Sequence, residues 1–432
     1  MKRRIEASLE LWQSKRDRLP LLLYGARQVG KTHLLREFGR THYDNVAYVN
    51  LETNLLASSY FQDNINPRDI IASLEVETGE RIVPGRTLVI LDEVQSNPRA
   101  LTSLKYFAEQ AGEYHVAAAG SLLGVAVNRE QHSFPVGNVE SVTLHPFDFE
   151  EYLWAVGEED LATRIRQGYA DDQPLPEALH SRALSRYRQY LVVGGMPRAV
   201  VEHEKSGSLL GVPDIQRGIL SDYAADTTKY ATESESIKIR AAFDSIPAQL
   251  AKDNHKFQYK VARKGGTAAI FGAAVEWLGF AGVSLKCDRL ATARMPLAAY
   301  MDLTGFKLYM GDTGLLTMKS GIPMSLVLAT EGTDVGFLGA LAENYVAQAL
   351  SALGHPLYYW TSDSVAEIDF VLQLGEHIIP VEVKAGQRTK SRSLSVFMDE
   401  YQPPYAIRLS TKNFGFHNRI KSVPLYAAFC IH

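Results

Sequence analysis

Short, almost continuously apolar runs mark the first third of the chain. They lie at residues 20–24, 87–91 and 114–119, and a further strand is predicted at residues 45–50. Runs of this length and composition are typical of strands that are buried on both faces of a sheet. Stretches with helical spacing of apolar residues, at residues 5–12 and around 67–78, accompany them. The pattern therefore predicts an α/β fold for this part of the chain.

The segment after the first run carries a phosphate-binding motif. It reads Gly-Ala-Arg-Gln-Val-Gly-Lys-Thr and fits G-x-x-x-x-G-K-[ST] at every constrained position. The backbone N–H groups of such a loop, together with the N-terminus of the following helix, bind the phosphates of a nucleoside triphosphate. We expect Lys31 to reach the β- and γ-phosphates and the Thr32 hydroxyl to bind Mg²⁺. The predicted cofactors are ATP and Mg²⁺, and the predicted nucleotide-binding residues are Gly25, Ala26, Arg27, Gln28, Val29, Gly30, Lys31 and Thr32.

Two acidic residues end the second apolar run and complete the candidate ATPase site. Carboxylates at the carboxyl end of a buried strand lie where doubly wound sheets bind their ligands. We expect Asp92 to hold the hydration shell of Mg²⁺ and Glu93 to orient the attacking water. Asn50 ends a neighbouring strand and is predicted either to contact Glu93 or to stabilise a turn. The alternative for the acidic pair is a helix cap in a loop.

Two further polar residues are predicted to act near the γ-phosphate. Ser121 follows the strand at residues 114–119, at the tip of which a hydroxyl can touch the phosphate or the water. Arg129 is the one Arg or Lys between Lys105 and Arg164, and we expect it to complete the site of a neighbouring copy as an arginine finger. A solvent-exposed arginine is the alternative for Arg129.

Composition limits the classes of protein that fit. A length of 432 residues indicates two to four domains, and the net charge of −4 requires any nucleic-acid contact to use a local basic surface. Two cysteines are too few for a disulfide framework, and no apolar run approaches the length that spans a membrane. These features predict a cytoplasmic protein.

The middle of the chain is predicted to form two smaller segments. Residues 156–235 have helical patterns and a Gly-Gly-Met-Pro breaker, and we interpret them as a helical lid. Residues 236–330 read as helices followed by a hairpin-like strand, a pattern that suggests a winged-helix-like segment. Basic residues in this segment are predicted to meet nucleic-acid phosphates, or else to form a solvated helix face. They are Lys252, Lys256, Lys260, Arg263 and Lys264.

The last hundred residues carry a second group of charged side chains. An apolar-patterned helix at residues 337–353 places Glu343 at the border of its apolar face. A predicted hairpin pairs residues 367–372 with 377–384, and it carries Asp369 on one strand and Glu382-x-Lys384 on the other. Asp369 and Glu382, with Glu343 reaching in, form the ligand set expected for a divalent cation, and Lys384 would polarise the attacking water. A cross-strand salt bridge on an exposed face is the alternative.

Together these stretches resemble a family of bacterial and archaeal AAA-type ATPases that carry a C-terminal domain of unknown function. The resemblance implies a P-loop AAA-type ATPase core, a winged-helix-like segment and a restriction-endonuclease-like C-terminal α/β domain. It rests on residues 25–32, 91–95, 120–121, 194–197, 306–316, 343–345, 367–370 and 380–384. The predicted domains are a P-loop ATPase core (1–155), a helical lid (156–235), a winged-helix-like segment (236–330) and a restriction-endonuclease-like domain (331–432).

These patterns predict an ATPase that couples binding and hydrolysis of Mg·ATP to movement of a DNA-directed C-terminal module. Its expected partners are ATP, DNA and a second copy of the chain, with no membrane. Two other functions fit the same residues. One is an ATP-dependent regulatory or defence switch whose C-terminal domain binds DNA or protein without cutting it, and the other is an ATP-gated nuclease.

Overall fold

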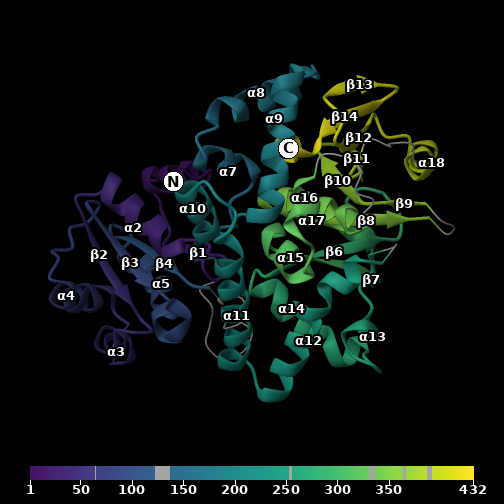
Figure 1. Ribbon diagram of the computed structural model, residues 1–432. Coiled ribbons are helices and arrows are strands. Elements are labelled where there is room, and N and C mark those ends of the chain that lie inside the picture. The colour runs from purple at the N-terminus through teal and green to yellow at the C-terminus, as the bar shows by residue number, and fades with distance from the viewer. Residues whose placement is uncertain (64, 122–136, 253–254, 330–335, 363–365, 387–391) are drawn as a thin grey trace. The chain divides into compact units, whose positions relative to one another are not determined.

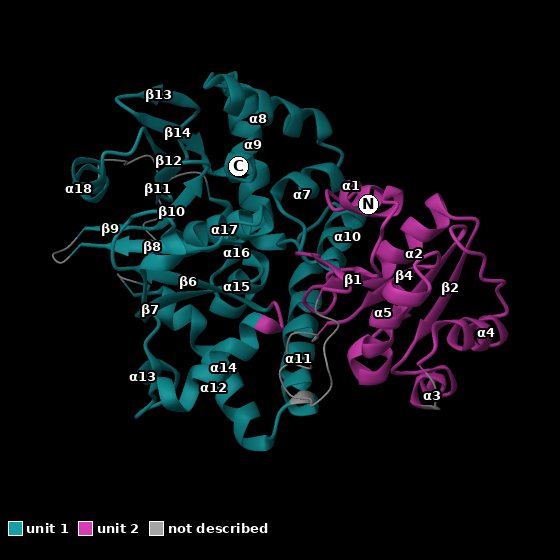
Figure 2. Cartoon of the chain, turned by 180° about the vertical axis from the view of Figure 1, so that it is seen from behind, with its two compact units in different colours: residues 1, 146–279, 283–432 teal, residues 2–145, 280–282 magenta. Residues whose placement is uncertain are grey.

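The computed structural model describes residues 1–63, 65–121, 137–252, 255–329, 336–362, 366–386 and 392–432 (Figure 1). They form two compact units (Figure 2). The N-terminal unit comprises Lys2–His145 with Phe280–Gly282, and the C-terminal unit comprises Pro146–Gly279, Val283–His432 and Met1. In the described ranges, no helix is long and apolar enough to span a membrane.

A five-stranded parallel sheet forms the centre of the N-terminal unit, as the apolar runs predicted. Its strands are β1 (Leu21–Tyr24), β2 (Asn45–Asn50), β3 (Thr87–Asp92), β4 (His115–Ala119) and β5 (Glu140–Thr143), in the order β2-β3-β4-β1-β5. Every residue of β3 and β4 is buried. Because all five strands run in the same direction, their carboxyl ends share one edge of the sheet. That edge brings Asp92, Ser121 and the loop after β1 together.

Helices cover both faces of this sheet. They are α1 (Glu6–Ser14), α2 (Lys31–His42), α3 (Leu55–Asp63), α4 (Pro67–Thr78) and α5 (Pro98–Gln110), with a short 3₁₀ helix, η1 (Val94–Ser96). Helices α3, α4 and α5 pack on one face, in a core that includes Phe61, Leu74 and Phe107. Helix α2 packs on the other, where a Cβ on Gly39 would come within 2.5 Å of Val46. The layers are those of an α/β fold.

The N-terminal segment contacts the phosphate loop. Helix α1 forms as its spacing predicted, and it buries Leu9 and Trp12. The Arg3 guanidinium donates to the backbone carbonyl of Val29 at 3.3 Å and to that of His145 at 2.7 Å. Arg3 therefore ties the chain before α1 to the loop between β1 and α2.

The first half of the C-terminal unit is helical. Its helices are α7 (Phe149–Ala155), α8 (Glu159–Asp171), α9 (Glu177–Val193), α10 (Pro197–Ser206), α11 (Val212–Tyr230), α12 (Glu233–Leu250), α13 (Tyr259–Ala262) and α14 (Ala268–Phe280). Helices are present where the lid was predicted, while a lid function stays a prediction. The helices α12–α14 are followed by two antiparallel strands, β6 (Ser284–Leu290) and β7 (Met301–Met310). The sequence had not predicted β6.

Residues 306–316 contain the end of β7 and the start of a helix. Helix α15 (Thr313–Ser320) begins there because the Asp312 side chain accepts a hydrogen bond from the N–H of Leu315. The same carboxylate accepts from the N–H of Gly195 at 2.6 Å. A Cβ at Gly195 would lie 2.0 Å from the carbonyl oxygen of Phe147, so this close approach requires glycine.

Two sheets complete the C-terminal unit. One has the order β7-β6-β8-β9 and the other β10-β11-β12-β14-β13. The remaining elements are α16 (Met324–Leu328), α17 (Phe337–Ala352), β8 (Tyr358–Thr361), β9 (Glu367–Ile368), β10 (Phe370–Leu374), β11 (His377–Val383), α18 (Arg392–Tyr401), β12 (Ala406–Ser410), β13 (Gly415–His417) and β14 (Ile420–Pro424), with 3₁₀ helices η2 (Leu297–Tyr300) and η3 (Leu425–Cys430). The predicted hairpin is present as β10 and β11, with Leu374 opposite His377.

The strand predicted at residues 367–372 is divided at Asp369. Its first two residues form β9, which pairs with β8 in the four-stranded sheet, and the rest form β10 in the five-stranded sheet. Asp369 thus stands at the junction of the two sheets of this unit. The four-stranded sheet contains strands from both sides of residue 330. The division of the chain into four domains stays a prediction.

Candidate functional site

The loop after β1 has the backbone that tight phosphate-binding loops need. Gly25 has φ of 147° and Gly30 of 95°. A Cβ on Gly25 would lie 2.3 Å from the carbonyl oxygen of Leu144, so no larger residue fits there. Gly30 precedes α2 and offers no side chain to cap it, which leaves the N-terminal N–H groups of α2 to other partners. This geometry suits an anion at the helix N-terminus.

Lys31 is buried within the curve of this loop. Its ammonium group donates to the carbonyl oxygens of Gly25 at 2.8 Å and Ala26 at 2.9 Å. It also lies 3.3 Å from the hydroxyl of Ser121, which follows β4. The structure therefore brings the predicted residues Lys31 and Ser121 together at the carboxyl edge of the sheet.

Asp92 binds two hydroxyl groups through one carboxylate oxygen. Oδ2 accepts from Thr32 Oγ1 at 2.8 Å. It also accepts from the hydroxyl of Tyr48 at 3.0 Å. Burial, with the nearby Asp92 charge, raises the pKa of Tyr48 to about 12, so this group stays a donor. The sequence did not single out Tyr48, because a tyrosine inside a strand is usually a packing residue.

Glu93 lies next to Asp92 in a left-handed backbone conformation, with φ of 51°. Its Oε2 accepts from the Gln95 side-chain amide at 2.5 Å. Burial raises the pKa of Glu93, while the bond from Gln95 lowers it. Asn50 stabilises the turn after β2, because its Oδ1 accepts hydrogen bonds from the N–H groups of Glu52 and Thr53, both at 3.0 Å. Arg129 lies outside the described residues.

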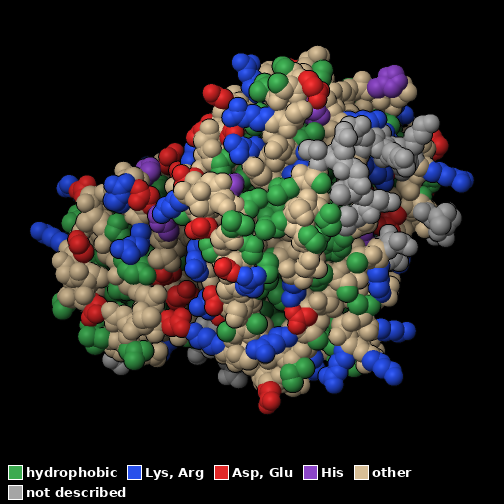
Figure 3. Space-filling view, in the orientation of Figure 1, with side chains coloured by type: hydrophobic (Ala, Val, Ile, Leu, Met, Phe, Trp, Pro, Cys, Tyr) green, Lys and Arg blue, Asp and Glu red, His purple; other side chains and the backbone are tan. Residues whose placement is uncertain are grey.

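The basic residues of residues 236–330 are gathered near α13. Lys260, Arg263 and Lys264 are exposed, on α13 and the turn after it. Lys252 donates to the side chain of Gln258 at 2.8 Å. Figure 3 shows Lys and Arg side chains gathered around this helix. The segment therefore presents positive charge to solvent.

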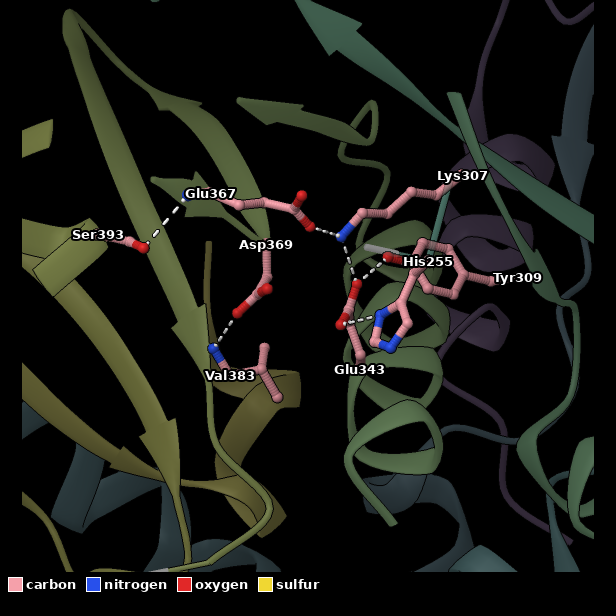
Figure 4. Close-up of polar contacts among 8 residues, drawn as sticks. All are labelled: His255, Lys307, Tyr309, Glu343, Glu367, Asp369, Val383 and Ser393. Carbon is pink, nitrogen blue, oxygen red and sulfur yellow. Dashed lines mark hydrogen bonds and ion pairs between the residues drawn. The ribbon is translucent and has the colours of Figure 1, made fainter. Parts of the chain in front are cut away.

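The predicted C-terminal site is a network of ion pairs centred on Glu343 (Figure 4). Glu343 Oε1 accepts from the ammonium of Lys307 at 2.8 Å and from the hydroxyl of Tyr309, and Oε2 lies 2.7 Å from Nδ1 of His255. Lys307 also pairs with Glu367 at 2.7 Å. Burial would raise the pKa of Glu343, but Lys307 and His255 hold it well below its ordinary range. Glu343 is therefore ionised and paired.

Of the other three predicted residues of this site, Glu382 and Lys384 pair with each other, and Asp369 has a different partner. Asp369 Oδ2 accepts from the backbone N–H of Val383 at 2.7 Å. Burial, with the Glu343 charge, raises the pKa of Asp369 to about 7. Glu382 pairs with Arg408 at 2.9 Å, directly across from it on β12, and with Lys384 at 3.5 Å. In the part of the chain that the structure describes, no three His, Cys, Asp or Glu residues form a group that could hold a metal.

Lys307, His255 and Arg408 were missed from the sequence. Lys307 left one signal, because it interrupts the apolar strand Phe306–Met310 on the same face as Tyr309. Its partners lie 36 and 60 positions further along the chain, beyond any local pattern. The alternation of β7 could have indicated that a charge is buried there.

Three family models match the chain. Residues 17–153 match the AAA domain, and residues 184–325 and 338–428 match two domains of unknown function, DUF8612 and DUF4143. Uncharacterized proteins of Mycobacterium bovis and Mycobacterium tuberculosis are each 37% identical over 91 residues, which is 21% of this chain and 19% of each relative. The chain thus matches about a fifth of the length of these curated relatives.

Solved structures with similar arrangements have low sequence identity. A Walker-type ATPase of Pyrococcus abyssi is 15% identical, with a TM-score of 0.44 over 74% of this chain and 95% of that one. The ORC2 protein of Aeropyrum pernix is 15% identical, with a TM-score of 0.37 over 81% and 92%. Residues 17–153 therefore match the model of an AAA domain and form a parallel sheet with a phosphate-binding loop after β1.

Proposed function

We propose that this chain is an AAA-type ATPase that binds Mg·ATP at residues 25–32, hydrolyses it, and uses the cycle to move a DNA-directed C-terminal module. The convergence of Lys31, Thr32, Asp92 and Glu93 at one edge of the sheet carries the proposal. Their spacing in sequence reaches 62 positions, so the fold and not the motif alone brings them together.

Each residue has a role that its contacts support. The Lys31 ammonium now donates to loop carbonyls, and phosphate oxygens are stronger acceptors that would take these bonds over. Thr32 and Asp92 offer a hydroxyl and a carboxylate oxygen, the hard donors that Mg²⁺ prefers, so this pair fits the ion. Bound Mg²⁺ would neutralise charge on the phosphates. Glu93 would accept hydrogen bonds from the attacking water and orient it.

Two substitutions test the ATPase site. Lys31→Ala should abolish nucleotide binding, because it removes the charge that faces the phosphates. Glu93→Gln should keep binding and lose turnover by roughly a hundredfold or more, because only the water-orienting carboxylate changes. The matched controls Lys105→Ala and Glu109→Gln change an exposed pair on α5. Normal turnover by the Glu93→Gln protein would refute the assignment.

An arginine finger from a second copy stays part of the proposal. Arg129→Ala should then lower turnover without weakening ATP binding, and turnover per chain should rise with protein concentration. Turnover that depends on neither would leave Arg129 a surface residue.

DNA is the proposed partner of the C-terminal unit, with a restriction-endonuclease-like fold for residues 331–432. The exposed residues Lys260, Arg263 and Lys264 support a phosphate contact. Replacing all three with alanine should weaken binding to a duplex and reduce its salt dependence. In the matched control, alanine replaces Arg68, Arg81 and Arg86, which are all exposed on the N-terminal unit. This control should bind the duplex as the unchanged protein does. An equal loss of duplex binding in the two triple variants would contradict a specific DNA-binding surface at Lys260, Arg263 and Lys264.

We do not propose that the C-terminal unit cleaves DNA. The β10–β11 hairpin carries Asp369 and Glu382-x-Lys384 as a nuclease would, but their carboxylates have separate partners. A cleavage assay with Mn²⁺ and the variants Asp369→Asn and Lys384→Ala checks this choice. Cleavage that both variants abolish would restore the nuclease alternative.

A further inference from the structure

We propose that Lys307 supplies the built-in cation of the carboxylate cluster formed by Glu343, Glu367 and Asp369, so that this cluster takes no divalent metal. Its contacts join the two edge strands of the four-stranded sheet, β7 and β9, to helix α17. The inference uses contacts within this unit alone and does not depend on ATP hydrolysis.

The position of the Lys307 ammonium is the first observation. The side chain is fully buried, yet its nitrogen lies 2.8 Å from Glu343 and 2.7 Å from Glu367. It also faces the ring of Tyr359, 5.1 Å from the centroid. A charge this deeply buried is tolerated only when it is paired, and here the pairing is with the carboxylates that a metal would need.

Glu343 has no oxygen that is not already in use. Oε1 accepts from Lys307 and Tyr309, and Oε2 faces His255. A metal that took Oε1 of Glu343 from Lys307 and Tyr309 would leave the buried ammonium of Lys307 with Glu367 as its remaining carboxylate partner. Removing one member of a buried ion pair is strongly destabilising, because the other charge stays buried.

The charges around the cluster balance without a metal when His255 is protonated. Asp369 and Glu382 join the two glutamates, which makes four carboxyl groups on neighbouring elements. Lys307, Lys384 and Arg408 face them, and His255 contributes a fourth charge when protonated. An added divalent ion would therefore meet repulsion from three permanent cations.

The contacts of Lys307 show what the cluster does. They join β7 to α17, through Glu343, and to β9, through Glu367. Asp369 follows directly and bonds to the backbone of Val383 at the end of β11. Figure 4 shows these side chains meeting where β9 and β11 approach α17. One buried cation thus joins the two edge strands of the four-stranded sheet to helix α17.

Metal binding by the full-length protein without nucleotide tests the inference. Electron paramagnetic resonance counts the Mn²⁺ bound to the unchanged protein and to the Asp369→Asn protein. We expect equal counts, because any weak binding at the phosphate loop is common to both. Asp399→Asn, an exposed residue of α18, is the matched control. A loss of bound Mn²⁺ with Asp369→Asn but not with Asp399→Asn would overturn the inference.

The Lys307→Ala variant gives the second arm. It removes the ammonium and leaves room among three carboxylates, so the variant should gain a bound Mn²⁺ that Asp369→Asn then removes. Lys286→Ala, at an exposed lysine of the adjacent strand β6, should gain none. If the Lys307→Ala protein folds but binds no extra Mn²⁺, the inference that the Lys307 ammonium takes the place of a metal ion is overturned. If that variant does not fold, the comparison with Asp369→Asn decides alone.

Discussion

At the scale of single side chains, we expect Tyr48 to position the carboxylate of Asp92. Its hydroxyl and that of Thr32 hold one oxygen of the carboxylate. Tyr48→Phe removes one neutral hydrogen bond, worth about 1 kcal/mol, so kcat/KM for ATP should fall roughly three- to tenfold. The Mg²⁺ concentration needed for half-maximal turnover should rise as well. Tyr106→Phe on α5 is the control, and an unchanged Mg²⁺ requirement in Tyr48→Phe would remove the role.

His115 makes the N-terminal unit sensitive to acid. It is buried beside Tyr43, whose hydroxyl lies 2.7 Å from Nδ1. Burial lowers the pKa of His115 from 6.5 to about 4. The unfolded chain binds this proton more readily than the folded one, so the stabilising contribution is complete above pH 6.5 and is lost as pH falls toward 4. We expect a loss of about 2 kcal/mol over that window.

Urea unfolding at several pH values measures this effect. His115→Gln should show a shallower decline of the free energy of unfolding between pH 6.5 and 4 than the unchanged protein. His33→Gln, at an exposed histidine, should keep the original slope. Parallel slopes in all three proteins would show that another group controls the acid response.

The side chains that the sequence correctly predicted as neighbours come either from one motif or from the ends of parallel strands. Lys31 and Thr32 are adjacent, and Asp92 follows from the rule that strand ends share an edge of a parallel sheet. Lys307 could not be placed in the same way, because its partners are set by how the four-stranded sheet and helix α17 meet. Predictions of roles for Glu93, Ser121 and Lys384 remain to be tested by activity.

Asp312 determines where one element ends and the next begins. It caps α15 and also binds Gly195, at the turn between α9 and α10. Asp312→Ala removes both bonds and leaves a buried N–H without an acceptor, so the free energy of unfolding should fall by about 2–4 kcal/mol. Urea titration with Asp399→Ala as control measures it. A loss below about 0.5 kcal/mol would mean that the cap contributes little.

Strands and helices with strong patterns could be predicted, and those that depend on tertiary contacts could not. The apolar runs of β1, β3 and β4 and the helix α4 have the predicted bounds within a few residues. The break at Asp369 has no local signature, because residues 367–372 alternate like one continuous strand. Helix α17 has a feature that its apolar pattern did not predict, because the polar residues Asn344 and Gln348 are buried among its apolar ones. They bond to Met310 and Thr313, which lie over 30 positions away.

At the scale of the whole molecule, the proposed coupling can be measured by hydrogen exchange. The Glu93→Gln protein with ATP should protect residues 25–32, because bound phosphate engages their backbone N–H groups. If the nucleotide drives the C-terminal module, exchange in residues 331–432 should change as well. The Lys31→Ala protein with ATP should show neither change. Protection restricted to the N-terminal unit would contradict the coupling while leaving nucleotide binding intact.

The buried Lys307 has a consequence for how the protein depends on its surroundings. A cation that is part of the polypeptide is present in every molecule in a fixed ratio, and no chelator can extract it. The junction between β7, α17 and β9 should therefore form as soon as the chain folds, and equally well in cells starved of metal. A change in metal supply should therefore leave this junction unaltered.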